Sequence, residues 1–467
     1  MRRVTGIVAL TLAGLALAAC SSPTGQPASP TPARGSMAPP AATASPGPEG
    51  ARFAAGPADD GRYFVDQEGD PWFGRGDTAW SLVGQLDPEE VDRYLDDRAA
   101  RGFNLVLANV LEHYFSDNAP TNYRNDPPFT DEPFSSPPNE AYWRHVDYVV
   151  EAARLRGITM LLCPAYLGWS DEEGWAEEIR AATDEQLAEF GRFLSSRYGQ
   201  FTNIMWLIGH DRVPDATEKA RMEALVAELP ADDLVGLGAT PSADALGSVP
   251  WKSTTVSPDF ETIYTYDDTS AQDTALAWGL TPARPIMFLE GRYEQERDGG
   301  LGDPMLRRQD YGSFVAGASA AIFGNNPIWH FESVSLYDYE GTWQDNLSSP
   351  GTGDAQRFAD FVNGLPWWQM HPDIAGELLV NTDLPGNTGA RFSSSHAAVY
   401  VSTSSSVVLD LSKLTAVRLA ELVRFDPRTG ESEVVGVYGT DEIVTVDSPG
   451  SNAAGDDDWV YVLSPAD

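Results

Sequence analysis

The 467-residue sequence predicts an α/β protein, a (β/α)8 TIM barrel followed by a small antiparallel β-sandwich. Two observations support this fold class. From about residue 56, eight short apolar runs alternate with amphipathic helical stretches, which is typical of a parallel sheet built from βα units. After Trp367 and Trp368, short alternating strands and turn residues replace that pattern. We therefore expect a barrel over residues 56–371 and a β-sandwich over residues 372–467.

The expected barrel strands are nearly continuous apolar runs, as strands buried on both faces are. They are residues 71–76, 103–110, 158–165, 203–209, 234–239, 260–266, 285–290 and 320–324. Helix signals lie between them. Asp87 and Pro88 offer an N-cap and a first helical residue, and Gly102 ends that helix. Apolar residues at helical spacing predict two more helices, which end by Gly157 and Gly199.

The C-terminal part shows the alternation of half-buried strands. Its expected strands are residues 397–401, 407–411, 422–425, 433–437 and 459–463. The turn sequence Asp-Pro-Arg-Thr-Gly at residues 426–430 separates two of them. We find no catalytic pattern in this part of the sequence, and its role is open between glycan binding and support of the barrel.

The first 20 residues have the pattern of a secretory signal. Two arginines precede an apolar stretch, and small residues lead to Cys20. The ending Leu-Ala-Ala-Cys resembles the bacterial lipobox, which implies a lipoprotein with an acylated Cys20; the alternative is a plain signal peptide with a chance cysteine. Residues 21–55 are rich in Pro, Ala, Ser and Thr, a composition typical of a disordered tether. We therefore expect an extracytoplasmic protein that is anchored to the bacterial cell membrane only through this lipid.

Composition excludes several classes of protein. The chain has 31 Lys and Arg against 69 Asp and Glu, a formal charge of −38. Phosphate backbones repel such a chain, so we expect no nucleic-acid partner. Two cysteines are too few for a disulfide framework, and Cys163, inside an apolar run, is expected to be a buried inert thiol. We expect a monomer.

Metal and serine chemistry are not indicated. The six histidines, at 113, 145, 210, 330, 371 and 396, form no HxH or HExxH pattern, and no GxSxG sequence is present. We therefore expect no metal and no cofactor.

Two carboxylates stand where a barrel builds its active site. Asp211 follows the fourth strand and Glu290 ends the seventh, so both are expected at the mouth of the barrel, nearly opposite each other. A retaining glycosidase needs such a pair, about 5 Å apart, one as nucleophile and one as acid/base. Arg212 or Arg292 would hold the nucleophile ionised. The alternative is a simple ion pair of each carboxylate with its neighbouring arginine.

At these residues the sequence resembles the apiosidase-like glycoside hydrolases, bacterial barrel proteins that often carry a C-terminal "collagen-binding" sandwich. The matching pieces are residues 76–80 (Gly-Asp-Thr-Ala-Trp), 94–95, 101–104 (Arg-Gly-Phe-Asn), 206–212, Glu290 with 293–294, 308–309, 425–430 and 458–460. The resemblance implies Asp211 as general acid/base and Glu290 as nucleophile. The sequence departs from the family at His210, where glycine is common, and at Arg292, where proline is frequent.

Sugar-binding residues are expected at strand ends and in two long loops, residues 112–138 and 167–175. The candidates are Asp77, Trp80, Asn109, His113, Tyr166, His210, Tyr264, Tyr266, Arg292 and Trp329. Asp77 has a second interpretation, the cap of the first helix. Trp169 and Trp175 either stack on sugars or plug their loop onto the barrel.

The sequence thus predicts an extracytoplasmic glycoside hydrolase that cleaves a glycosidic bond in a plant or microbial wall polysaccharide, with retention. Apiose in pectin gives the resembled family its name, and arabinofuranosyl residues are another candidate. The alternative from a different class is a surface lipoprotein that binds glycan or host matrix without hydrolysis.

Overall fold

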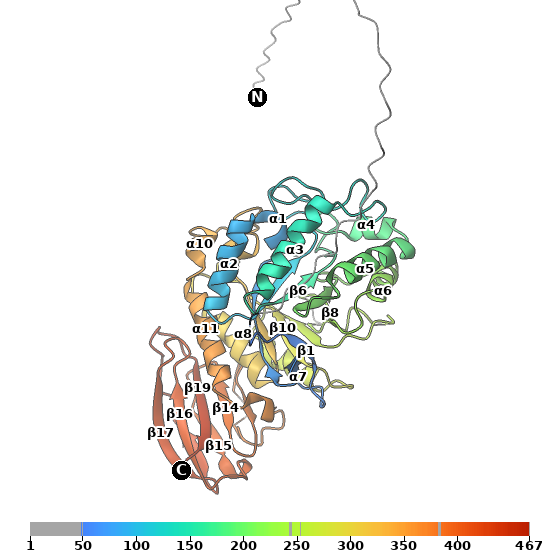
Figure 1. Ribbon diagram of the computed structural model, residues 1–467. Coiled ribbons are helices and arrows are strands. Elements are labelled where there is room, and N and C mark those ends of the chain that lie inside the picture. Colours follow the sequence, from blue (N-terminus) through green and yellow to red (C-terminus); the bar gives the residue numbers. More distant parts are fainter. Residues whose placement is uncertain (1–47, 49, 242–244, 253, 382–383, 467) are drawn as a thin grey trace, which may run out of the picture. The chain divides into compact units, whose positions relative to one another are not determined.

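The computed structural model describes residues 48, 50–241, 245–252, 254–381 and 384–466 (Figure 1). The expected signal peptide, with Cys20, and most of the expected tether lie outside the described residues. The folded part begins slightly earlier than expected, because strand β1 (Ala54–Pro57) starts two residues before the expected start of the barrel. Among the described residues, no helix combines the length and apolar character that crossing a membrane requires.

Eight parallel strands form the barrel that the sequence predicts. They are β4 (Gly74–Thr78), β5 (Leu105–Asn109), β6 (Thr159–Cys163), β7 (Ile204–Ile208), β8 (Leu234–Leu237), β9 (Glu261–Tyr264), β10 (Ile286–Glu290) and β11 (Ala320–Phe323). The strand order is β8-β7-β6-β5-β4-β11-β10-β9, and a parallel bridge between Gly236 and Phe260 brings β8 to β9. The sheet is therefore a nearly closed barrel, and the predicted fold class is confirmed.

One predicted barrel strand is wrong in its bounds. Residues 71–76 are split between β3 (Pro71–Trp72) and β4. β3 belongs with β1 and β2 (Phe64–Asp66) to a separate antiparallel sheet that the sequence analysis missed. Phe64 and Trp72 from this sheet pack with Leu161, Met205 and Phe260, whose side chains fill the barrel interior. The small sheet therefore closes the barrel end opposite the loops that follow the strands.

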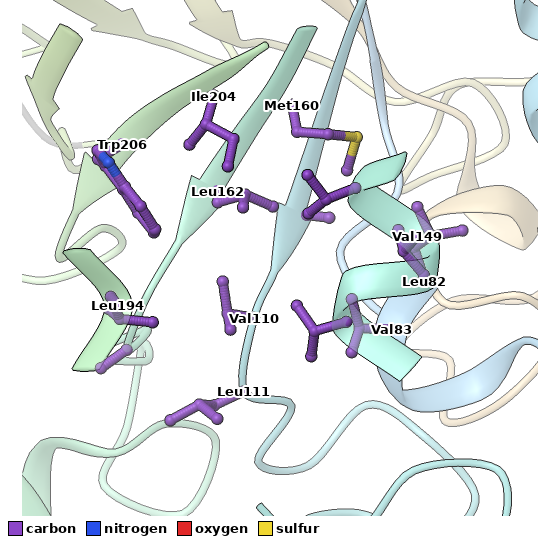
Figure 2. Packing of buried hydrophobic residues seen from close by; sticks show 14 of the residues in the cluster. Leu82, Val83, Val110, Leu111, Val149, Met160, Leu162, Leu194, Ile204 and Trp206 are labelled. Carbon is purple, nitrogen blue, oxygen red and sulfur yellow. The ribbon is translucent and has the colours of Figure 1, made fainter. Parts of the chain in front are cut away.

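Helices cover the outside of the barrel. The longer ones are α2 (Pro88–Ala100), α3 (Glu140–Arg154), α5 (Asp184–Tyr198), α6 (Ala216–Val226), α7 (Ser270–Trp278), α8 (Pro304–Val315) and α11 (Pro350–Asn363), and the short ones are α1 (Leu82–Gln85), α4 (Ala176–Ala181), α9 (Asn326–Trp329) and α10 (Trp343–Asn346). The predicted cap is confirmed, since Asp87 and Glu90 form a complete capping box at α2. Figure 2 shows Met160 on the side of the strands that faces Val149 and Leu82 of the helices, with Leu162 and Ile204 in the same buried cluster.

The C-terminal part consists of antiparallel sheets. The larger has the order β12 (His371–Pro372), β13 (Gly389–Phe392), β14 (Ala397–Val401), β19 (Trp459–Pro465), β16 (Leu419–Phe425) and β17 (Ser432–Gly439). The smaller pairs β15 (Val407–Asp410) with β18 (Ile443–Val446). Leu409 and Val444 of the small sheet pack with Val399 and Leu422 of the large one. The five predicted strands are present, and β12, β13 and β18 were missed.

Candidate active site

A cavity of about 520 Å³ opens at the carboxyl ends of the barrel strands. It is lined by both predicted catalytic residues and by most of the predicted sugar-binding residues: Asp211, Glu290, Trp80, Asn109, Tyr166, Tyr264, Tyr266 and Trp329. The last residues of β5, β9 and β10 and the segments after β4, β6, β7, β9 and β11 supply these side chains. This end of a barrel is where loops of different strands converge, so residues far apart in the sequence meet there.

Glu290 is the last residue of β10 and is 5% exposed. Its Oε2 lies 2.8 Å from Nε2 of His210, and its Oε1 accepts a hydrogen bond of 3.0 Å from the hydroxyl of Tyr266. The pKa of Glu290 is raised, because burial outweighs the hydrogen bond and charge of His210, which act to lower it. The two hydrogen bonds fix the carboxyl group and favour its ionised form.

Asp211 lies in a turn directly after β7. Its backbone N–H donates to the carbonyl of Ala239 at 3.1 Å, and its Oδ2 accepts a hydrogen bond from the hydroxyl of Tyr166. Burial and the charge of Asp211 raise the pKa of Tyr166 well above its ordinary value, so this hydroxyl keeps its proton. Asp211 therefore faces the cavity with one oxygen already held by a neutral donor.

Aromatic side chains form the walls around the two carboxyl groups. The indole of Trp80 donates to the hydroxyl of Tyr293 at 3.1 Å, and the rings of Trp80 and Tyr166 lie 5.7 Å apart. On another wall, Phe115 packs edge-on against Trp329 with 5.0 Å between ring centroids. Flat apolar faces beside fixed hydrogen-bonding groups suit a ligand with an apolar face and polar edges.

The cavity also contains a third buried carboxyl group that sequence reasoning missed. Glu296 is 8% exposed and accepts a hydrogen bond of 2.8 Å from the indole of Trp329. Burial raises its pKa to about 7, the indole hydrogen bond opposes this rise, and the charge of Glu290 adds to it. Its neighbour Arg297 lies over the ring of Tyr266, 4.3 Å from the centroid.

Other lining residues were also missed: Phe115, Glu173, Pro241, Tyr293, Arg297, Leu336 and Tyr337. The short distance in sequence from Glu290 could have indicated Tyr293, Glu296 and Arg297, because they lie on the same loop after β10. No comparable signal marks Leu336 and Tyr337.

Asp77 does not face the cavity, which corrects its predicted role. It is fully buried on the helix side of β4, where its Oδ2 lies 2.6 Å from Nε of Arg98 and accepts a 2.7 Å hydrogen bond from Tyr94. It does not cap the first helix either, since Ser81 stands at that position. The position of Asp77 on the outer face of the strand makes it part of a buried ion pair.

His113 is also placed elsewhere. Its Nε2 lies 3.4 Å from Glu178, and its ring packs edge-on against Trp175. Trp175 is buried and donates to the carbonyl of Leu111, so it plugs its loop, whereas Trp169 is 64% exposed at the cavity. The plug interpretation therefore holds for Trp175, and sugar stacking by Trp169 stays a prediction.

The neighbouring arginines do not hold the catalytic carboxylates. Arg292 lies 2.6 Å from Asp298, and Arg212 lies 2.7 Å from Asp171. The predicted stabilisation of Glu290 by an arginine is therefore wrong, and so is the alternative of two simple ion pairs. Arg292, predicted to bind sugar, does not line the cavity.

His210 takes the place next to Glu290 that an arginine was expected to fill. The side chain is fully buried and does not line the cavity, so it does not contact a ligand directly as predicted. Cys163 is buried, as predicted, and burial raises the pKa of its thiol. Within the described ranges, no group of three or more His, Cys, Asp or Glu side chains is arranged to hold a metal ion.

Comparisons with known proteins identify both parts of the chain. Residues 58–369 match the family model "Apiosidase-like, catalytic domain", and residues 384–464 match "Putative collagen-binding domain of a collagenase". A comparison with curated proteins found no match. A solved structure titled "Glycoside hydrolase" superposes with a TM-score of 0.75 at 20% identity, covering 89% of this chain and 97% of that one.

A glycoside hydrolase family 5 structure from Bacteroides vulgatus gives the same TM-score and identity and covers 89% of this chain and 94% of that one. At this identity the two structures establish the shared fold. The family model spans more than half of the chain. The matched part includes Asp211, Glu290 and the residues that are hydrogen-bonded to their side chains. The chain belongs to the apiosidase-like family, and it is a glycoside hydrolase with a carbohydrate substrate.

Proposed function

We propose that the protein hydrolyses its glycosidic bond with retention, with Glu290 as nucleophile and Asp211 as general acid/base. One observation carries this assignment: both carboxyl groups line one cavity, and their surroundings differ. Glu290 accepts hydrogen bonds from His210 and Tyr266, which favours an ionised group. One oxygen of Asp211 accepts a hydrogen bond from Tyr166, and the other oxygen is the one that exchanges a proton with the substrate.

In the first step, a carboxylate oxygen of Glu290 bonds to the anomeric carbon while the bond to the leaving oxygen breaks. The proton of Asp211 passes to that oxygen, so the leaving group departs as an alcohol. In the second step, Asp211 takes a proton from water, whose oxygen attacks the anomeric carbon. The ester bond breaks, and Glu290 is released as a carboxylate.

The substrate proposed is an oligo- or polysaccharide of plant or microbial cell walls. Stacking surfaces support this, because Trp80, Tyr264 and Trp329 line the cavity around the carboxyl groups. Apiosyl and arabinofuranosyl units are the first candidates, on the family resemblance. A protein that only binds glycan has no need for two carboxyl groups with individually arranged donors, so the cavity favours hydrolysis over binding alone.

Sugar release on a panel of polysaccharides tests the proposal. The soluble chain, residues 21–467, is incubated with apiose-bearing pectin, arabinan, xylan and bacterial wall polymers beside Glu290→Gln and Asp211→Asn. A matched control is Asp171→Asn, a half-exposed carboxylate outside the cavity that pairs with Arg180 and Arg212. We expect release by wild type and by the control, with losses of at least about 10³-fold in the two site variants.

Proton NMR of the first-formed anomer tests retention. An inverted product would reject Glu290 as nucleophile. Binding of a polymer without release, unchanged in both site variants, would reject catalysis by this pair altogether.

We further propose that the mature protein is a monomer held outside the cytoplasm by a lipid on Cys20. The sequence of residues 1–20 supports the anchor. Mass spectrometry of the mature N-terminal peptide should show an acylated cysteine, and Cys20→Ala should move the protein from the membrane to the soluble fraction. Light scattering of residues 21–467 in solution tests the monomer.

A further inference from the structure

His210 has surroundings that are unusual for a histidine. Its ring lies between two aromatic rings, 5.3 Å from that of Trp80 and 4.9 Å from that of Tyr264, both nearly parallel to it. Nε2 lies 2.8 Å from Glu290, and Nδ1 has no hydrogen-bond partner in the described part of the chain. The aromatic slot leaves the ring little freedom except to point Nε2 at Glu290.

The backbone that carries this ring is strained. Gly209, His210 and Asp211 have φ angles of +78°, +109° and +64°, which glycine adopts easily and other residues rarely do. Neighbouring elements hold the turn in place. A Cβ at Gly238 would lie 2.5 Å from the backbone of His210, and one at Gly209 would lie 2.4 Å from Trp251. Such strain persists where surrounding structure fixes it, often at functional sites.

We propose that His210 is a positioning residue for Glu290, and that the strained turn sets the orientation of Glu290 and Asp211 together. The inference rests on the proposed function of this pair. The inference follows from the path of the chain. The turn places the His210 ring beside Glu290 of β10, and the next residue, Asp211, has its carboxyl group in the cavity. A change in the turn would therefore move both groups at once.

The other buried histidines show what burial alone does. Burial lowers the pKa of His145 and of His330 to about 4. Burial also acts to lower the pKa of His210, but the charge of Asp211 and the hydrogen bond to Glu290 outweigh it, and the pKa is raised. The titratable groups that face this ring are Asp211 on its own turn, Glu290 on β10 and Tyr264 on β9; Trp80 covers the other face.

The first test removes the ring and returns it as a free molecule. His210→Gly suits the φ of the turn and leaves an aromatic slot of imidazole size. On the polymer that wild type cleaves in the panel, we expect kcat to fall about 100-fold with KM changed less than threefold, since misplacement of a reacting group has effects of this size. Added imidazole should raise the kcat of His210→Gly at least about tenfold, which would not happen if the variant had only a structural defect.

His145→Gln is the matched control. His145 is a buried histidine on α3 outside the cavity, so its loss should leave kcat unchanged and insensitive to imidazole. Full activity of His210→Gly would overturn the proposal. A folded but inactive His210→Gly that imidazole does not rescue would also overturn it.

A second measurement needs neither a substrate nor a stable His210→Gly variant. Ring NMR of residues 21–467 with ¹⁵N-labelled histidine follows the titration of His210 in wild type and in Glu290→Gln. We expect the midpoint to fall by at least about one pH unit in Glu290→Gln, because the carboxylate partner is lost. An unchanged midpoint would overturn the proposal even if no polymer is cleaved, whereas a shifted midpoint without cleavage would count against the proposed function alone.

Discussion

The hydroxyl of Tyr266 donates a hydrogen bond to Glu290, with 3.0 Å between Oη and Oε1, and the hydroxyl of Tyr264 lies 2.6 Å from that of Tyr266. The pair of tyrosines thus forms a short chain of neutral donors that ends at the proposed nucleophile. This hydrogen bond opposes the rise that burial causes in the pKa of Glu290. The chain therefore connects β9 to the ionisation of a group on β10.

Tyr266→Phe should lower kcat/KM by about 10- to 100-fold, the effect of losing a hydrogen bond to a charged group. The acid-side midpoint of the pH–rate profile should move up, since the pKa of Glu290 rises and a higher pH is then needed to ionise it. Tyr264→Phe, which keeps both the ring and the bond from Tyr266 to Glu290, is the control and should show a smaller loss. Equal losses and no shift of the midpoint would contradict this role of Tyr266.

Asp77→Asn should act on stability and leave sugar binding unchanged. Asp77 and Arg98 are both fully buried, and their closest side-chain atoms are 2.6 Å apart. Removing one partner leaves the other charge buried, at a cost of about 3 kcal/mol. Chemical denaturation should show this loss, with KM within twofold of wild type. A large rise in KM at normal stability would restore the sequence prediction that Asp77 binds sugar.

Glu296→Gln should change how stability depends on pH. The pKa of Glu296 is about 7 in the folded protein against an ordinary 4.5, so the folded state holds more protons between those values. Stability from this group is therefore lost as pH rises from about 4.5 to 7. Gln does not ionise, so the variant avoids this loss. Between pH 4.5 and pH 7 its free energy of unfolding should rise by up to about 3 kcal/mol relative to that of wild type.

Denaturation of wild type and Glu296→Gln at pH 4.5 and pH 8 measures the difference. The exposed Glu431 offers the control Glu431→Gln. A stability difference that is the same at both pH values would contradict the altered ionisation of Glu296.

The sequence predicted the barrel strands well because burial on both faces makes each of them a continuous apolar run. It failed where two short strands adjoin without a break in that run, as at β3 and β4. The missed strands β12 and β13 are short, and β18 alternates exposed and buried residues over four positions, which is too little pattern to separate it from a loop.

The site was predictable where strand ends determine it. Glu290 is the last residue of a buried strand and Asp211 comes three residues after another, so their place at the barrel mouth follows from the fold. Asp77 shows the limit, because successive residues of a strand point to opposite faces and a shift of one residue separates the cavity from the helix layer. The paths of long loops carry no period, so the contribution of Tyr337 had no sequence signal.

Arg307→Met should destabilise the barrel and the C-terminal sheets together. Arg307 lies on α8 and is 1% exposed; its guanidinium contacts Asp354 of α11 at 2.9 Å, and Asp456 and Asp458, just before β19, at 2.6 and 2.9 Å. Without this cation, the fully buried Asp458 loses its guanidinium partner, whereas Asp354 keeps its pairs with Arg357 and Arg428. Loss of one partner of a buried ion pair costs about 3–5 kcal/mol.

Since these carboxylates belong to both parts of the chain, we expect one unfolding transition in wild type and a single transition at lower temperature in Arg307→Met. Arg424→Met is the control, because Arg424 pairs on the surface with the exposed Glu433, and such pairs contribute about 0–1 kcal/mol. If calorimetry of Arg307→Met showed the wild-type transition temperature, or if wild type already unfolded in two separate steps, this network would not join the two parts. A single lowered transition would mean that the sheets after residue 371 support the helix that follows β10, and through it the strand that ends in Glu290.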